Sequence, residues 1–170
     1  MQFTWYSFDQ MEASQAIAML SLRHRVFGEE QLYAGQEVDD WDKVSQHLCV
    51  TEGKEVLACL RLCQLISDTY DTYEIGRLCV APEYRHQGIG KKMVNIAILK
   101  GMGNGMEAKI ETSAPAYLSK FYRSAGFETV GDPWAEDAIP HVFLRLSKPS
   151  LLENLTLEPL KRPSRALYHR

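Results

Sequence analysis

Two glycines, an arginine and a lysine in the middle of the chain have the types and spacing of an anion-binding loop. The segment reads Arg85-His-Gln-Gly88-Ile-Gly90-Lys91 and follows an apolar run that ends at Val80. Because glycine carries no Cβ, backbone N–H groups at Gly88 and Gly90 can approach a diphosphate closely. A helix that begins there adds unpaired N–H groups and the positive end of its dipole. Arg85 and Lys91 could neutralise the remaining charge.

The loop matches neither of two common nucleotide-binding motifs. A P-loop ends in Gly-Lys-Ser/Thr, whereas Gly90-Lys91 is followed by a second lysine. The dinucleotide-binding fingerprint has a glycine where this sequence has Arg85. Two glycines would also suit a plain structural turn, so the loop taken alone leaves both interpretations open.

Apolar periodicity predicts alternating strands and helices around this loop. Strand-like runs span about 3–7, 46–51, 55–65, 73–80, 108–112 and 142–146, and helical spacing spans about 11–27, 89–100 and 118–125. The segment between 28 and 46 is acidic and irregular. Loops of that length in a small domain are usually functional or contain a short helix.

Composition restricts the class of protein. The chain has 170 residues, 45% hydrophobic and 24% charged, with a formal net charge of −3. These values are typical of a soluble globular domain and predict neither a nucleic-acid-binding face nor a membrane protein. The start of the sequence lacks the pattern of a signal peptide. We therefore expect a cytoplasmic protein.

The four cysteines predict no disulfide framework and no metal site. They lie in apolar runs without a Cys-x-x-Cys pair, at Cys49, Cys59, Cys63 and Cys79. We expect buried, reduced thiols and no metal.

The end of the chain differs in character from the rest. Residues 148–170 contain three prolines, six leucines and a basic end, whereas 1–147 carry the alternating pattern. We predict one domain over 1–147 and a C-terminal extension that docks on that domain or on a partner subunit. A homodimer is therefore possible.

The loop and a second motif resemble one known superfamily. Arg-x-x-Gly-x-Gly after a strand that ends Leu-Cys-Val resembles the acetyl-CoA-binding motif of the GCN5-related N-acetyltransferase (GNAT) superfamily. About 30 residues on, Phe121-Tyr122-Arg-Ser-Ala-Gly126-Phe127 resembles its Phe-Tyr-x-x-x-Gly-Phe block. The likeness covers roughly residues 1–147. Within it, segments 26–31, 75–77 and 137–141 are similar to the ElaA-like branch of poorly characterised bacterial acetyltransferases.

The resemblance implies a fold and a donor. The fold is α/β (α+β): a mixed, mostly antiparallel sheet of six or seven strands flanked by about four helices. The donor is acetyl-CoA, whose pantetheine enters where strand 73–80 splays from its neighbour. The implied cofactor-binding residues are Leu78, Cys79, Val80, Arg85, His86, Gln87, Gly88, Ile89, Gly90, Lys91 and Tyr122. The Leu78–Val80 backbone would polarise the thioester carbonyl, and the N–H groups of 86–91 would bind the pyrophosphate.

The resemblance also implies catalytic residues. Tyr122 falls on the general-acid position, where a phenol can protonate the departing thiolate, although its helical spacing also suits simple packing. Many members carry asparagine where this sequence has Pro115, so that cofactor contact is lost or is supplied by Ser113.

The general base and the acceptor site are less specified. Glu74, just upstream of the acetyl site, could deprotonate an ammonium substrate, or it could be an exposed strand-edge residue. His47 and His141 are rivals that could line the acceptor pocket or act structurally. We also predict substrate contacts from Glu30 and Arg77. The acidic stretch 29–42 could favour a cationic substrate, or could be a solvated loop.

The predicted function is N-acetylation of a primary amine, on a small molecule or a protein, by direct attack in a ternary complex. One alternative is an acyl-homoserine-lactone-synthase-like acyltransferase, because Leu22-Arg23-x-x-Val26-Phe27 and Glu37-x-Asp39-x-x-Asp42 resemble those enzymes. Such enzymes normally lack the glycine loop, since acyl carrier protein delivers their acyl chain. A second alternative is a CoA-binding module without turnover.

Overall fold

The computed structural model describes residues 1–66, 71–103, 108–136 and 139–146. The predicted extension over 148–170, its docking and the homodimer that it suggested all lie outside the described residues. The domain boundary at 147 therefore stays a prediction.

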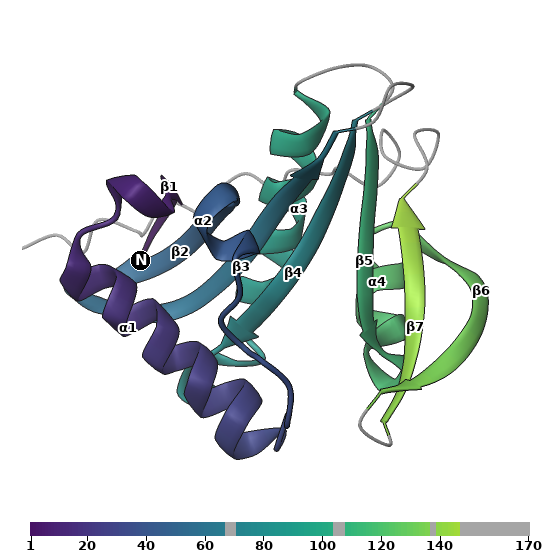
Figure 1. Cartoon of the computed structure of the whole chain (residues 1–170), viewed down its shortest axis with the longest axis horizontal. Coiled ribbons are helices and arrows are strands. Elements are labelled where there is room, and N and C mark those ends of the chain that lie inside the picture. The colour runs from purple at the N-terminus through teal and green to yellow at the C-terminus, as the bar shows by residue number, and fades with distance from the viewer. Residues whose placement is uncertain (67–70, 104–107, 137–138, 147–170) are drawn as a thin grey trace, which may run out of the picture.

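A single seven-stranded sheet forms the centre of the described chain (Figure 1). Its strands are β1 (Gln2–Ser7), β2 (Gln46–Glu52), β3 (Glu55–Leu65), β4 (Thr72–Val80), β5 (Lys109–Pro115), β6 (Phe127–Glu136) and β7 (Ile139–Leu146). They lie in the order β1-β2-β3-β4-β5-β7-β6. Only β4 and β5 pair in parallel, and every other neighbouring pair is antiparallel. The predicted mixed, mostly antiparallel sheet is confirmed.

Four α-helices cover the two faces of this sheet. They are α1 (Ala13–Arg23), α2 (Trp41–Val44), α3 (Ile89–Met102) and α4 (Ser119–Arg123). Helix α1 lies on one face and α3 on the other (Figure 1). Side chains alternate between the faces with the two-residue period of a strand, so Leu48 and Val50 join the apolar cluster on the α3 side while Cys49 joins the cluster on the α1 side.

Helix α1 is shorter than the predicted span of 11–27 because its character changes. From His24 to Glu30 the chain continues as a π-helix, which closes with the N–H of Gln31 bonded to the carbonyl of Val26 at 3.1 Å. π-helical turns occur frequently at functional sites. This one ends at Glu30, a predicted site residue.

Strand β6 was not predicted. Its sequence contains Gly131-Asp-Pro133, which is typical of a turn, and the strand accommodates it with an irregularity. The register with β7 shifts between Val130 and Trp134, and Gly131 adopts a φ of +75°. A long strand with a bulge therefore looked like a loop in the sequence.

The predicted burial of the cysteine thiols, without a disulfide, is confirmed within the described residues. All four cysteines are free and buried. Burial raises the pKa of the Cys49 thiol, which keeps it protonated and unreactive. Among the described helices, none combines the length and the apolar character needed to cross a bilayer.

Strands β4 and β5 separate along their length, and this split positions the site. They pair only over Thr72–Glu74 and Lys109–Glu111. Beyond Glu74 the two strands diverge into a V (Figure 1). The backbone of β4 from Ile75 onward therefore has no ladder partner on β5 among the described residues. The predicted splaying of strand 73–80 is confirmed.

Candidate active site

The glycine loop has the backbone shape of an anion cradle. His86 and Gly88 both adopt left-handed conformations, with φ of +61° and +77°. Gly88 is also the N-cap residue of α3, so the helix begins at Ile89. Successive left- and right-handed residues direct neighbouring N–H groups toward one concave surface, and the helix start adds more. The backbone of residues 86–91 therefore fits a diphosphate.

A cavity of about 520 Å³, which we call the cofactor-side cavity, opens beside this loop. Nine of the predicted cofactor-binding residues line it: Leu78, Cys79, Val80, Arg85, His86, Gly88, Gly90, Lys91 and Tyr122. Two predicted residues do not line it. The side chain of Ile89 is buried in the main core, and that of Gln87 is exposed. Only the backbone of these two residues remains available for the predicted role.

Arg85 is already bonded to protein groups. Its guanidinium donates to both carboxylate oxygens of Glu30 at 2.7 Å each, and its Nε donates to the carbonyl of Val80 at 2.9 Å. Glu30 was predicted in the acceptor site, but it lines the cofactor-side cavity instead. The hydrogen bonds from Arg85 lower the pKa of Glu30. Arg85 thus joins the loop to the π-helix and is not a free neutralising charge.

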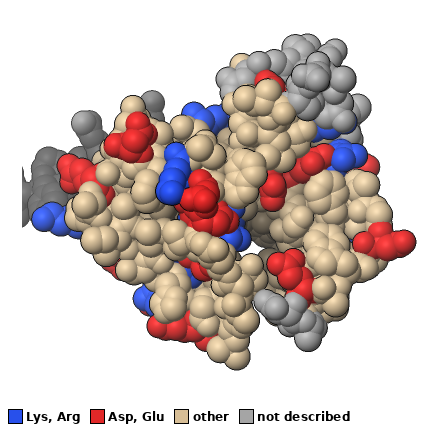
Figure 2. Space-filling model, viewed as in Figure 1, with Lys and Arg blue, Asp and Glu red and all other residues tan. Residues whose placement is uncertain are grey.

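A second cavity, of about 280 Å³, lies in the split between β4 and β5. Gln31, Leu78, Leu118 and Tyr122 line both cavities, so the two meet at these residues. Figure 2 shows this face of the molecule, hollowed between the half built from α1 to β4 and the half built from β5 to β7. Acidic side chains gather on both sides of the hollow.

Tyr122 lies at the junction of the two cavities and is only 4% exposed. Its ring packs edge-on against Phe121 and Phe127, which fixes its direction. Burial raises the pKa of Tyr122 to about 12, while a hydrogen bond with the Thr112 side chain acts against that shift. Thr112 in turn donates to the carbonyl of Ile75 at 2.8 Å. Tyr122 is therefore a neutral phenol near pH 7 and carries a proton that it can donate.

Glu74 lines the second cavity where the strands begin to separate. Burial raises the pKa of Glu74 above its ordinary value, against the opposing charge of Arg61. No described residue forms an ion pair or hydrogen bond with its carboxylate. A half-buried, unpaired carboxylate with a raised pKa has the properties of a general base. The prediction of an exposed strand-edge residue is therefore wrong.

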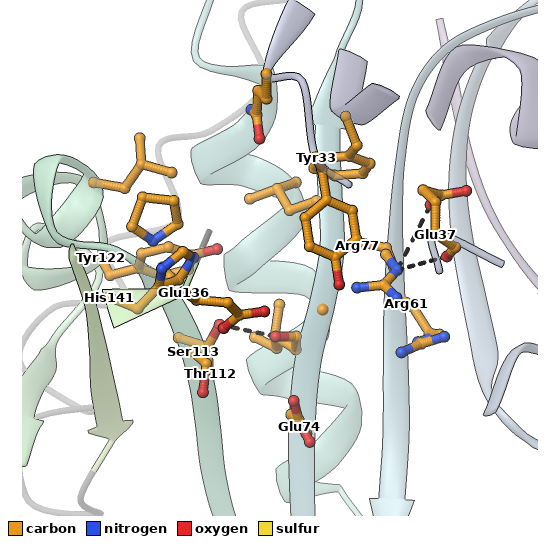
Figure 3. A pocket seen from close by; sticks show the side chains of 18 residues that line it. Tyr33, Glu37, Arg61, Glu74, Arg77, Thr112, Ser113, Tyr122, Glu136 and His141 are labelled. Atoms are coloured by element: carbon orange, nitrogen blue, oxygen red, sulfur yellow. Dashed lines mark hydrogen bonds and ion pairs between the residues drawn. The ribbon is translucent and has the colours of Figure 1, made fainter. Parts of the chain in front are cut away.

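His141 and Glu136 enter the same cavity from β7 and β6, opposite Tyr33 and Arg77 (Figure 3). The Nδ1 of His141 lies 3.0 Å from the carbonyl of Ile139, and because a carbonyl only accepts, Nδ1 carries the proton. With Nδ1 as the donor, a singly protonated ring has its acceptor at Nε2. Trp134 stacks on the ring with centroids 5.9 Å apart.

His47 does not reach either cavity. It is 1% exposed, and its Nε2 donates to the backbone carbonyl of Asp42 at 2.9 Å. Burial lowers the pKa of His47, which keeps the ring neutral. The structure therefore gives His47 a structural role, and the predicted contact with substrate is wrong.

The acidic segment is a solvated loop only in part, because Glu29, Glu30 and Asp40 are exposed while its other carboxylates are taken up in ion pairs. Three of its carboxylates (Glu37, Asp39 and Asp42) pair with three arginines, Arg23, Arg61 and Arg77, in one ionic cluster. We call these six residues the arginine–carboxylate cluster. It joins α1, β3 and β4 to the segment that covers the second cavity. Arg77, predicted as a substrate contact, does line that cavity but is bonded within the cluster.

Several lining residues had no signal in the sequence. They are Gln31, Tyr33, Thr112, Leu118 and Glu136. Ser113 and Pro115 also line the second cavity and not the cofactor-side one. Their positions follow from strand pairing and from the path of segment 31–37, which periodicity does not reveal.

Comparisons with known proteins agree with this geometry. The sequence profile of the acetyltransferase (GNAT) domain matches residues 43–129. The UPF0039 protein of Schizosaccharomyces pombe is 31% identical over 147 residues, which cover 86% of this chain and 97% of that protein. The crystal structure of an acyl-CoA N-acyltransferase from Pseudomonas aeruginosa has a TM-score of 0.79 at 29% identity and covers 86% of this chain and 100% of that one.

The chain belongs to the GNAT superfamily of acyl-CoA-dependent acyltransferases. Protein ElaA of Escherichia coli is 28% identical over 135 residues, covering 78% of this chain and 88% of ElaA. The ElaA crystal structure has a TM-score of 0.79 at 25% identity, covering 86% of this chain and 100% of that one. Within the superfamily, the chain therefore falls in the ElaA-like branch, as the sequence motifs predicted.

Proposed function

We propose that the protein transfers the acetyl group of acetyl-CoA to a primary amine by direct attack while both substrates are bound. The observation that carries this proposal is the junction of the two cavities at Gln31, Leu78, Leu118 and Tyr122. One cavity contains the anion cradle and the other contains an unpaired carboxylate. Substrates bound in the two cavities meet at the phenol of Tyr122, and holding both in place supplies much of the rate enhancement.

The donor occupies the cofactor-side cavity. The N–H groups of residues 86–91 bind its diphosphate, assisted by Lys91, and the backbone of Leu78–Val80 binds the pantetheine. This assignment is supported by the left-handed backbone at His86 and Gly88 and by the missing ladder partner of β4. An N–H of this strand aimed at the thioester oxygen stabilises the oxyanion that forms on attack, which is commonly the largest catalytic contribution.

Glu74 acts as the general base and Tyr122 as the general acid. Glu74 removes a proton from the ammonium group, and the free amine forms a bond to the carbonyl carbon. The carbon–sulfur bond then breaks, and Tyr122 donates its proton to the sulfur. The second proton lost by the nitrogen restores Tyr122, and the first leaves from Glu74 to water.

The charges of the second cavity favour a cationic acceptor. Both arginines that line it, Arg61 and Arg77, are bonded to carboxylates of the arginine–carboxylate cluster. Glu74 and Glu136 have no such partner among the described residues. The net field that an incoming group meets is therefore negative, which suits a small-molecule amine or the amine of a lysine or protein N-terminus.

Calorimetric titration with acetyl-CoA tests the donor site, using Gly88→Glu beside Gly53→Glu as a matched control. Both glycines have positive φ, +77° and +60°, and at both a Cβ would meet no other atom within 4 Å. The backbone strain of about 1–2 kcal/mol is thus comparable. Only Gly88→Glu places a negative side chain at the cradle.

We expect saturable binding by the wild type and by Gly53→Glu, and loss of binding in Gly88→Glu. Screening amines for acetyl-CoA-dependent thiol release would then identify the acceptor. A wild type that does not bind acetyl-CoA would overturn the proposed donor, and mixing with acylated acyl carrier protein would become the next assay. Binding without thiol release for any amine would favour the non-catalytic module.

A further inference from the structure

Arg77 is a non-glycine residue in the left-handed region inside a strand, with a φ of +50°. It lies at a bulge, since Cys59 pairs with Cys79 but Arg61 pairs with Gly76. One residue of β3 therefore stands opposite two residues of β4, Arg77 and Leu78. The left-handed conformation costs a residue with a Cβ roughly 1–2 kcal/mol, so other contacts must hold it.

The side chain of Arg77 supplies those contacts. Its Nε donates to the carbonyl of Glu37 at 2.9 Å, and its Nη2 donates to the carbonyl of Gln36 at 3.2 Å and to the carboxylate of Asp39 at 3.1 Å. A planar guanidinium can satisfy these acceptors together, which a single ammonium cannot. The bulge is thereby tied to segment 36–39, whose Glu37 lies beside Arg77 on the same side of the second cavity (Figure 3).

The partners of Arg77 are themselves fixed. Glu37 accepts from Arg23 of α1, and Asp39 accepts from Arg61 of β3 at 2.6 Å. Arg23 is 1% exposed and also holds Asp42 through two bonds, at 2.7 and 3.1 Å. The carboxylates that hold Arg77 are therefore themselves held by a buried arginine and by Arg61.

The next residue, Leu78, lines both cavities at their junction. We propose that Arg77 is a positioning residue for acyl transfer: its bonds to Gln36, Glu37 and Asp39 hold the bulge of β4 and so direct the Leu78 backbone toward the thioester carbonyl. This inference rests on the proposed function. Arg77 acts through the backbone of Leu78 and does not itself touch the reacting atoms.

The carbonyl stretching frequency of bound acetyl-CoA reports this positioning, and the measurement needs no amine substrate. A hydrogen bond from the strand polarises the thioester carbonyl and lowers its stretching frequency. We would record isotope-edited infrared difference spectra of acetyl-CoA labelled with ¹³C at the carbonyl, bound to the wild type and to Arg77→Ala, Arg77→Gly and Arg77→Lys. Calorimetry gives the Kd of each complex. Arg145→Ala, which breaks the ion pair with Glu111 between β7 and β5, is the matched control.

We expect the carbonyl stretching frequency of bound acetyl-CoA to be lowered in the wild type and in Arg145→Ala. This shift should be lost in Arg77→Ala and Arg77→Gly and partly restored in Arg77→Lys. The Kd for acetyl-CoA should be largely retained in all of these variants. Glycine removes the backbone strain, so a normal shift in Arg77→Gly would show that the guanidinium is dispensable and overturn the inference. If Arg77→Ala does not fold, Glu37→Gln removes a carboxylate partner instead, and an unchanged shift there also overturns it. If the wild type does not bind acetyl-CoA, the proposed function fails together with this inference. If the wild type binds and the Arg77 variants keep the normal shift, only the role of Arg77 fails.

Discussion

At the scale of single residues, the proposed mechanism divides proton transfer between two groups with opposite properties. Tyr122 is buried among aromatic rings, and burial raises its pKa to about 12, so it holds its proton near pH 7. Burial raises the pKa of Glu74, so its ionised form accepts a proton more readily than an ordinary glutamate does. A group that holds a proton beside a group that can accept one is the usual arrangement of an acid and a base.

Glu74→Gln tests the base. Glu74 works only when ionised, so kcat/KM of the wild type falls as pH drops through its raised pKa, above the range of an ordinary glutamate. The glutamine variant should have a kcat about 10²- to 10³-fold lower, with its Kd for acetyl-CoA unchanged. It should also lose the fall of kcat/KM at low pH, the acidic limb of the pH profile. Initial rates of thiol release from pH 4.5 to 8, with an amine found by screening, measure both effects.

Glu136→Gln is the matched control for that prediction, because Glu136 also lines this cavity and has no ion-pair partner within the described part of the chain. It should raise KM for a cationic amine while leaving kcat and the acidic limb in place. Full activity in Glu74→Gln would assign the base to His141, whose Nε2 remains an acceptor.

Sequence reasoning succeeded for residues whose role depends on local backbone. Gly88 and Gly90 were recognised because an anion cradle needs residues without a Cβ at fixed spacing. It failed for residues whose role depends on distant partners. The sequence left His47 open between a pocket-lining and a structural role, and the structure buries it against Asp42. Glu30 was predicted as an acceptor contact but pairs with Arg85, 55 positions away. Burial and long-range pairing leave no periodic trace in one sequence.

At the scale of elements, the π-helix 24–30 and the glycine loop are joined by the pair between Glu30 and Arg85. In the free protein Arg85 is bonded to the Glu30 carboxylate, so Glu30 would compete with the diphosphate of an incoming acetyl-CoA for Arg85. We therefore predict that Glu30→Gln tightens acetyl-CoA binding by about fivefold, equivalent to the ~1 kcal/mol of a partly exposed ion pair. Calorimetric Kd values at low and high salt measure it, and the difference should shrink as salt rises.

Glu83→Gln controls for the general loss of one negative charge near the loop. Glu83 lies in the turn before the loop and pairs with Arg25 at 3.6 Å. It should leave the Kd almost unchanged. Weaker binding in Glu30→Gln would contradict the competition and would mean that the pair shapes the loop for the diphosphate.

The elements themselves were largely predictable, with exceptions that have physical causes. Strands with clear alternation, such as β2 and β3, match their predicted spans within a residue. Strand β6 was missed because Gly131 and Pro133 interrupt its pattern, and the bulge that accommodates them became visible only in the pairing with β7. The end of α1 was misplaced because a π-helix keeps apolar spacing close to that of an α-helix.

At the scale of the whole molecule, the arginine–carboxylate cluster joins the α1 layer to the sheet beside the split between β4 and β5. Its centre is the pair of Arg23 and Asp42, which are 1% and 2% exposed. Burial alone would raise the pKa of Asp42, but the hydrogen bond and charge of Arg23 outweigh burial and lower it to about 2. Such a pair is costly to break from one side, because the remaining charge stays buried without its partner.

Asp42→Asn should therefore lower the free energy of unfolding by about 3 kcal/mol at pH 6. The folded-state pKa of Asp42, about 2, lies below its unfolded value near 4, so its stabilisation is complete above about pH 5 and is lost as pH falls through 2. Wild type and variant should converge by roughly 1.5 kcal/mol between pH 6 and pH 2.5. Urea unfolding at pH 6, 4 and 2.5 measures this. Asp40→Asn, in an exposed pair with Lys43 on the same segment, should change nothing measurable, and equal stability of Asp42→Asn and Asp40→Asn would refute a structural role for the cluster.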